Sequence, residues 1–152
     1  MTDELITSDH PLTAAQRSNL TALQDALIPA SGDGRMPSAG DFDLVDYLVR
    51  KSDAEAEAFL EKLPEVLDSL GAGFAVAPPD ERHAAVQSFS EADPGAFREL
   101  VFHTYGCYYQ DDRALVGIGM EKGPPFPRGN TIEAGDLSLL DPVVKGNHTY
   151  RK

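Results

Sequence analysis

Residues 97–112, FRELVFHTYGCYYQDD, hold the densest set of groups whose types and spacing could do chemistry. His103 is a candidate general base, because imidazole exchanges protons near neutral pH, and Asp111 and Asp112 are acids close by in sequence. Cys107 is the only cysteine of the chain and so its only candidate thiolate nucleophile. A stand-alone small enzyme that uses His103 with Asp111 or Asp112 is therefore one hypothesis for function.

The sequence around these groups lacks the signatures of catalytic and metal sites. No cysteine-hydrolase motif surrounds Cys107, and free cysteines are more often buried, so we interpret Cys107 as a core residue. The four histidines are far apart and form no HExxH. GIGMEKG at 117–123 has the wrong spacing for a dinucleotide site, and prolines follow it. We predict no catalytic, metal or cofactor site in this chain.

The charge of the chain limits its partners. It has 13 basic and 25 acidic residues, a formal net charge of −12, and such a field repels phosphate backbones. We expect no nucleic-acid partner. No apolar run is long enough to span a membrane, and residues 1–12 have neither the apolar core nor the twin arginine of an export signal. We expect a cytoplasmic protein; the alternative is a periplasmic protein whose leader was removed or whose partner carries the export signal.

Capping residues and helical spacing of apolar residues predict five helices. The first begins at Thr13, which forms a capping box with Gln16. The second covers residues 42–50, where apolar side chains lie on overlapping turns. The third begins at a second capping box, Ser52 with Glu55, and its apolar residues fall within an arc of about 120°.

Proline marks the start of the last two helices, with Pro79 in the first turn of one and Pro94, after the capping residue Asp93, in the first turn of the other. Beyond them prolines and glycines are too dense for regular structure, and no strand pattern is visible anywhere. The predicted class is all-α, a small bundle of about five helices with an extended C-terminal arm. The predicted divisions are a flexible N-terminus at 1–12, a helical domain at 13–116 and the arm at 117–152.

The last of these helices has an excess of apolar surface. Stepped at 100° per residue, its apolar and aromatic side chains cover about 220°, whereas a surface helix needs only about 100°. His103 falls on the narrow polar arc. Either the helix is the buried centre of the bundle or one face is covered by another chain, and tyrosines favour an interface. The candidate interface residues, in this helix and in the arm, are Phe102, Tyr105, Tyr108, Tyr109, Pro124, Pro125, Phe126 and Pro127.

Two parts of the sequence carry a family resemblance. LTAAQRSNLTALQDALIPAS at 12–31 forms a helix ending in an LIP turn, and DPGAFRELVFHTYGCYYQDD at 93–112 leads into VGIGMEKGPPFPRG at 116–129. These stretches resemble the opening helix, the closing tyrosine-rich helix and the glycine–proline arm of the gluconate 2-dehydrogenase subunit 3 family. Members of that family are small subunits of membrane-linked sugar and sugar-acid dehydrogenases.

The resemblance implies a non-catalytic small subunit that binds and stabilises a large FAD-dependent dehydrogenase or oxidase of the glucose-methanol-choline (GMC) type. It implies that the small subunit assists folding and cofactor loading, that FAD is held by the large subunit, and that a cytochrome or other electron-acceptor subunit is a further partner. In the family, export uses a twin-arginine signal, which this sequence lacks. From the residues alone, a stand-alone helical protein that binds a small ligand is a third hypothesis.

Overall fold

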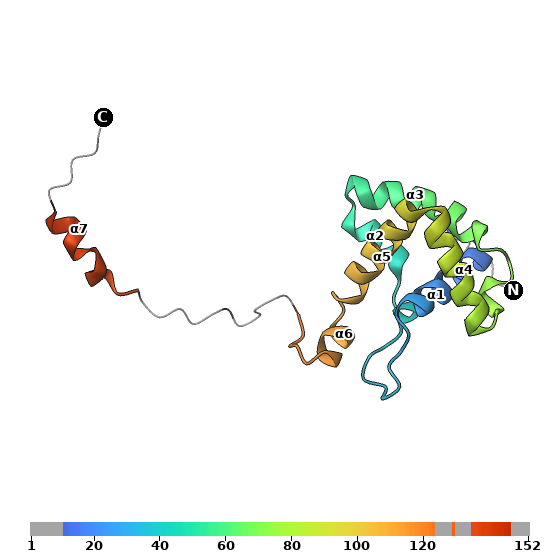
Figure 1. Ribbon diagram of the computed structural model, residues 1–152, viewed down its shortest axis with the longest axis horizontal. Coiled ribbons are helices and arrows are strands. Elements are labelled where there is room, and N and C mark those ends of the chain that lie inside the picture. Colours follow the sequence, from blue (N-terminus) through green and yellow to red (C-terminus); the bar gives the residue numbers. More distant parts are fainter. Residues whose placement is uncertain (1–10, 124–128, 130–134, 147–152) are drawn as a thin grey trace, which may run out of the picture.

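The computed structural model describes residues 11–123, 129 and 135–146, and every regular element in those ranges is helical (Figure 1). Five main helices form the bundle: α1 (Ala14–Leu27), α2 (Leu44–Lys51), α3 (Ala54–Ser69), α4 (Pro79–Ala92) and α5 (Pro94–Tyr108). The shorter elements are η1 (Ala39–Asp41), η2 (Phe74–Val76), α6 (Asp112–Gly117), η3 (Leu137–Leu140) and α7 (Asp141–Lys145). The predicted all-α class with about five principal helices is confirmed.

Two of the predicted helix starts depend on side chains that the structure places as expected. Thr13 Oγ1 accepts a hydrogen bond from the Gln16 amide at 3.3 Å, and Gln16 Oε1 accepts one from the Thr13 amide at 2.9 Å. Asp93 accepts a hydrogen bond from the Ala96 amide at 2.9 Å, with proline in the first turn of α5. Each cap satisfies amide groups that the first helical turn leaves unpaired.

The predicted capping box of Ser52 with Glu55 is wrong by one residue. Asp53 caps α3, because its carboxylate accepts a hydrogen bond from the Ala56 amide at 2.8 Å. Ser52 instead ends α2 in the left-handed region, with φ of 48°. The connection between the two helices, residues 52–53, is therefore shifted by one residue from the predicted position.

The main hydrophobic core forms where α5 contacts α2, α3 and α4, and α1 packs against α3 and α4 (Figure 1). Its centre consists of large side chains that are at most 1% exposed: Leu23, Leu44, Leu48, Phe59, Leu63, Leu67 and Leu100. Full burial of one such side chain stabilises the fold by roughly 1.5–3 kcal/mol. At Gly106, α5 approaches α2 so closely that an added Cβ would lie 2.5 Å from the Tyr47 hydroxyl oxygen.

A second, smaller core lies at the C-terminal end of α5. It consists of the buried residues Ala39, Phe42, Tyr108 and Ala114. These residues come from η1, the chain that follows it, α5 and α6, which are far apart in sequence. This second core fixes the position of α6 against the bundle.

Asn19 joins α1 to the connection between α3 and α4 from a buried position. Its side-chain amide donates to the carbonyl oxygens of Leu67 at 3.2 Å and Gly71 at 3.0 Å. Its Oδ1 accepts a hydrogen bond from the Ala75 amide at 3.2 Å. One side chain thus satisfies three backbone groups where α3 ends and η2 begins.

Replacement of Asn19 with alanine is expected to lower the free energy of unfolding by about 2–3 kcal/mol, because it leaves buried backbone groups without partners. Urea unfolding followed by circular dichroism measures this change. The matched control is Ser18→Ala, since Ser18 is exposed and makes a single hydrogen bond to the Ala14 carbonyl within its own helix. Equal losses of stability for the two variants would contradict the role assigned to Asn19.

The C-terminal arm contains helical structure where the sequence predicted none. Residues 137–145 form η3 followed directly by α7. Asp136 begins this stretch, since its carboxylate accepts a hydrogen bond from the Ser138 amide at 3.0 Å. Pro142 lies in the first turn of α7, where a missing amide proton costs no helical hydrogen bond. The density of prolines therefore did not exclude a short helix.

Candidate functional site

The face of α5 that points away from the core carries three aromatic side chains in one row. Phe102 is 59% exposed, Tyr105 is 47% exposed and Tyr109 is 45% exposed. Their spacing of three and then four residues places them within about 60° of one another on a helix. We call this row the α5 seam. Three of the four interface candidates predicted on this helix therefore lie together at the surface.

Ring contacts hold part of the α5 seam in a defined geometry. The Tyr105 and Tyr109 rings meet edge to face with centroids 6.0 Å apart, and Lys51 Nζ lies 5.2 Å from the centroid of the Phe102 ring. Exposed aromatic side chains with restricted motion lose little conformational entropy when a partner covers them. The seam is therefore suited to contact another protein.

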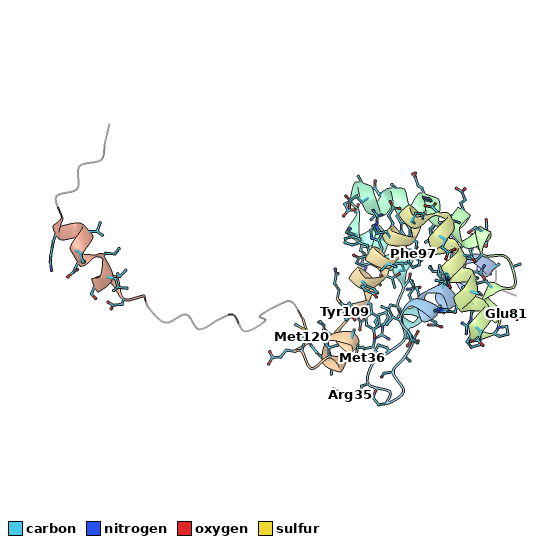
Figure 2. All side chains as sticks on the ribbon, in the orientation of Figure 1. Arg35, Met36, Glu81, Phe97, Tyr109 and Met120 are labelled. Atoms are coloured by element: carbon cyan, nitrogen blue, oxygen red, sulfur yellow. The ribbon has the colours of Figure 1, made fainter. Side chains whose placement is uncertain are left out.

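Aliphatic side chains extend the apolar surface beyond the α5 seam. Val116, Ile118 and Met120, which follow α5 along the chain, are each about half exposed. Figure 2 shows Met120 and Tyr109 at the same end of the bundle. None of the three was among the predicted interface residues: Ile118 and Met120 fall in the predicted arm, and Val116 is the last residue of the predicted helical domain. In the sequence these three apolar residues alternate with Gly117 and Gly119, and this alternation is the pattern that could have identified them.

Tyr108 is the one described interface candidate that the structure contradicts. It is fully buried, and its hydroxyl donates a hydrogen bond to the Pro37 carbonyl oxygen at 2.8 Å. Its ring meets Phe42 edge to face at 5.1 Å between centroids. Burial raises the pKa of the phenol. The physical reason for the error is the second core, which supplies both an apolar site for the ring and an acceptor for the hydroxyl.

His103 is buried rather than on a polar surface strip. It is 2% exposed, and its ring stacks on Phe59 at 5.0 Å between centroids and meets Phe102 edge to face at 5.3 Å. Nδ1 has no hydrogen-bond partner among the described residues. Burial lowers the pKa of His103, and the charge of Lys51 lowers it further. The neutral imidazole is therefore the form that fits this position.

This burial predicts a specific loss of stability in mild acid. The folded-state pKa of His103 lies below its ordinary value of 6.5, so the unfolded chain binds the proton first as the pH falls. The free energy of unfolding is expected to decrease below pH 6.5 toward the folded-state pKa, by at most about 1.4 kcal/mol per pH unit. Denaturant unfolding at several pH values measures the slope.

The variant His103→Gln should flatten that slope below pH 6.5, whereas His83→Gln serves as the control because His83 is exposed. The shifted carboxylates of Asp53 and Asp93 have pKa values below 3.8, so they act at lower pH. An unchanged slope in His103→Gln would show that another group causes the acid sensitivity.

Cys107 is partly buried and packs against both hydrophobic cores. Its Sγ lies 3.8 Å from the Asp43 carbonyl oxygen, to which the thiol donates. Burial raises the pKa of the thiol to about 11. The thiolate, which is the nucleophilic form, is therefore scarce at neutral pH. This geometry agrees with the interpretation of Cys107 as a packing residue.

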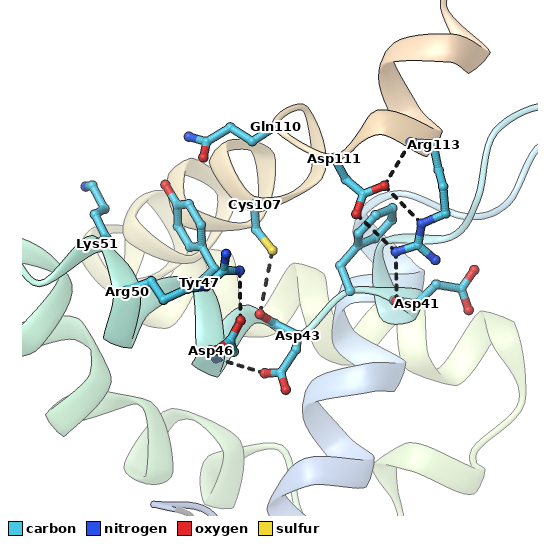
Figure 3. Close-up of a pocket in the computed structure, with 11 residues that line it drawn as sticks. Asp41, Asp43, Asp46, Tyr47, Arg50, Lys51, Cys107, Gln110, Asp111 and Arg113 are labelled. Atoms are coloured by element: carbon cyan, nitrogen blue, oxygen red, sulfur yellow. Dashed lines mark hydrogen bonds and ion pairs between the residues drawn. The ribbon is translucent and has the colours of Figure 1, made fainter. Parts of the chain in front are cut away.

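A groove of about 500 Å³ opens beside Cys107, between the start of α2 and the end of α5 (Figure 3). Its polar lining is Asp41, Asp43, Asp46, Tyr47, Arg50, Lys51, Gln110, Asp111 and Arg113. Most of these charges are engaged with one another or with the backbone. Arg50 pairs with Asp46 at 2.7 Å, and Asp43 accepts a hydrogen bond from the Asp46 amide at 2.9 Å. The groove thus carries paired charges that hold α2 and its cap in place.

The acids proposed to work with His103 have other partners. Asp111 caps α6 and pairs with Arg113 at 2.9 Å, which keeps the pKa of its carboxyl low. Asp112 accepts a hydrogen bond from the Gly123 amide at 2.9 Å. The ring contacts of His103 are instead with Phe59, Phe102 and Tyr47. The structure therefore does not bring the three candidate catalytic groups together.

The predicted interface residues Pro124, Pro125, Phe126 and Pro127 lie outside the described residues. Within residues 11–123, 129 and 135–146, no group of histidine, cysteine, aspartate and glutamate side chains is arranged to hold a metal ion. No helix in these ranges is long and apolar enough to cross a bilayer. No protein-family model matches the chain, and comparisons with curated proteins and with solved structures gave no match.

Proposed function

We propose that this chain is a non-catalytic small subunit that binds and stabilises a large FAD-dependent dehydrogenase or oxidase of the GMC type, acting on a sugar or sugar acid. The observation that carries the binding part of this proposal is the α5 seam. The class of the partner comes from the resemblance of residues 12–31 and 93–129 to small dehydrogenase subunits. FAD is held by the large subunit in this proposal, and a cytochrome or other electron acceptor completes the complex.

The composition of the α5 seam supports a protein partner over a small ligand. Tyrosine and phenylalanine are enriched in the buried centre of protein interfaces, where a few aromatic side chains supply most of the binding energy. The seam is a convex helix face, whereas small-molecule sites are concave and enclose most of their ligand. Val116, Ile118 and Met120 widen the apolar area that a partner would cover.

Stabilisation of the partner follows from mass action. A subunit that binds the folded large chain and not its unfolded form raises the stability of that chain by RT ln(1 + [L]/Kd), about 2.7 kcal/mol at a hundredfold excess over Kd. Folding and FAD uptake by the large subunit are then favoured together, because the folded form alone holds the cofactor. No chemistry is required of the small subunit in this role.

Co-expression with a large FAD-dependent flavoprotein of the GMC type tests the proposal. A tagged copy of the chain is expected to retain the flavoprotein during purification, and the complex is expected to show flavin absorbance. The large subunit expressed alone should be less soluble or contain less FAD. Recovery of this chain only as a free monomer, together with a fully FAD-loaded large subunit made without it, would contradict the proposal.

A further inference from the structure

The C-terminal stretch 137–145, which we call the tail helix, exposes a second apolar surface. Five large aliphatic side chains are each more than half exposed: Leu137, Leu139, Leu140, Val143 and Val144. Figure 1 shows α7 apart from the bundle. A helix of this length is marginal in water without a surface to pack on. The exposed apolar side chains and the short length of the tail helix therefore favour its packing against another surface.

The tail helix and the α5 seam have matching spacing. Leu137, Leu140 and Val144 are separated by three and then four residues, as are the aromatic residues of the seam. The seam extends over about 10 Å. Leu137 and Leu140 belong to the 3₁₀ helix η3, in which side chains three residues apart are eclipsed, and Val144 follows in α7, so the tail row has a similar length. When two helices pack with a small angle between their axes, the side chains in contact come from rows with this three- and four-residue spacing.

The charges at the ends of the two rows favour a parallel arrangement. The tail helix begins at Asp136 and ends at Lys145. On the bundle, Lys51 lies beside the Phe102 end of the α5 seam, and the exposed Asp112 follows its Tyr109 end. Parallel packing brings Asp136 toward Lys51 and Lys145 toward Asp112, whereas antiparallel packing brings like charges together.

The connection between the two surfaces is long enough for contact within one chain. Residues 124–136 span up to about 45 Å when extended, which exceeds the length of the α5 seam several times. A connection of this kind gives the tail helix an effective concentration of roughly 1 mM at the seam. A segment that binds with an intrinsic Kd of about 100 µM would then be docked in about ten chains for each open one.

We propose that the tail helix binds the α5 seam of its own chain, in parallel with α5. In the free protein, residues 137–145 then cover the α5 seam. Any partner that uses the seam must displace them. This regulatory consequence rests on the proposed function, whereas docking of the tail helix does not.

Hydroxyl-radical footprinting of the isolated full-length chain tests the docking, with oxidation of Tyr105 and Tyr109 measured by mass spectrometry. The native chain should be oxidised at these tyrosines about tenfold more slowly than the double variant Leu137→Asp/Leu140→Asp, as the docked fraction requires. Both replaced side chains are exposed, so the bundle should fold normally. Val76→Asp is the matched control, since Val76 is the most exposed large aliphatic residue of the bundle.

Equal oxidation of the native chain and the double variant would overturn the proposal. Protection that disappears on dilution, accompanied by a dimer in sedimentation, would also overturn it by assigning the seam to a second copy. The large subunit is absent from this experiment, so its outcome is independent of the proposed function.

A charge exchange tests the orientation. Lys145→Glu, made together with Asp141→Lys so that the ion pair between these two positions is kept, should reduce the protection of Tyr109 by placing an acid near Asp112, and Asp112→Lys in the same chain should restore it. Asp112→Lys alone is the control for loss of the hydrogen bond from the Gly123 amide. Failure of the added Asp112→Lys to restore protection would contradict parallel docking of the tail helix.

Discussion

Replacement of Tyr108 with alanine is expected to lower the free energy of unfolding by about 4 kcal/mol, the largest effect on stability expected of any tyrosine in α5. The ring is fully buried between Phe42 and the end of α5, and its loss leaves a cavity in the second core. It also leaves the Pro37 carbonyl oxygen, which is partly buried, without the hydroxyl donor. Urea unfolding followed by circular dichroism measures the change.

The neighbouring tyrosines provide the controls for this prediction. Tyr105→Ala and Tyr109→Ala remove rings that are about half exposed, so each should cost less than about 1 kcal/mol. Tyr108→Phe keeps the ring and should cost about 1 kcal/mol, for the hydrogen bond alone. A loss in Tyr105→Ala as large as that in Tyr108→Ala would contradict the division of α5 into a buried face and an exposed seam.

The fold was predictable where local side chains decide it. The caps at Thr13 and Asp93 use hydrogen bonds within four residues, so the sequence contains all the information that fixes those helix starts. The error at Ser52 arose because two adjacent residues could both cap α3, and the choice depends on how tightly α2 turns into α3. That turn is set by packing between the helices.

The outward and inward faces of α5 were only partly predictable. A helical projection places residues on faces but does not say what packs on each face. His103 was assigned to a polar strip, yet that side of the helix meets Phe59 of α3 and Tyr47 of α2. Tyr108 was assigned to a partner because the second core is assembled from segments distant in sequence. Both errors have the same cause, which is long-range packing.

The tail helix was missed for a local reason. Prolines and glycines are dense throughout 117–152 and predict irregular structure, whereas the cap of Asp136 and the spacing of Leu137, Leu140 and Val144 favour a short helix within that range. Proline in the first turn is compatible with a helix. A search for apolar residues at three- and four-residue spacing would have found this stretch.

Loss of the α5 seam is expected to have the largest effect on partner binding. Tyr105 lies at the centre of the row, between Phe102 and Tyr109, and truncation of a central interface aromatic residue typically costs 2 kcal/mol or more. Tyr105→Ala should therefore weaken binding of the large subunit about 30-fold, and replacement of all three seam residues by alanine should remove detectable binding.

The central claim is that the α5 seam binds the large flavoprotein subunit, and the dissociation constant of that complex tests it most directly. Biolayer interferometry with the immobilised, FAD-loaded large subunit would use chains that carry Leu137→Asp/Leu140→Asp, so that the tail helix does not compete for the seam. It would compare this background with its Tyr105→Ala and Val76→Ala derivatives, Val76 being an exposed residue far along the chain from the seam. The account predicts an unchanged Kd for Val76→Ala and about a 30-fold higher Kd for Tyr105→Ala. Native affinity in the variant that lacks all three seam aromatic residues would contradict it.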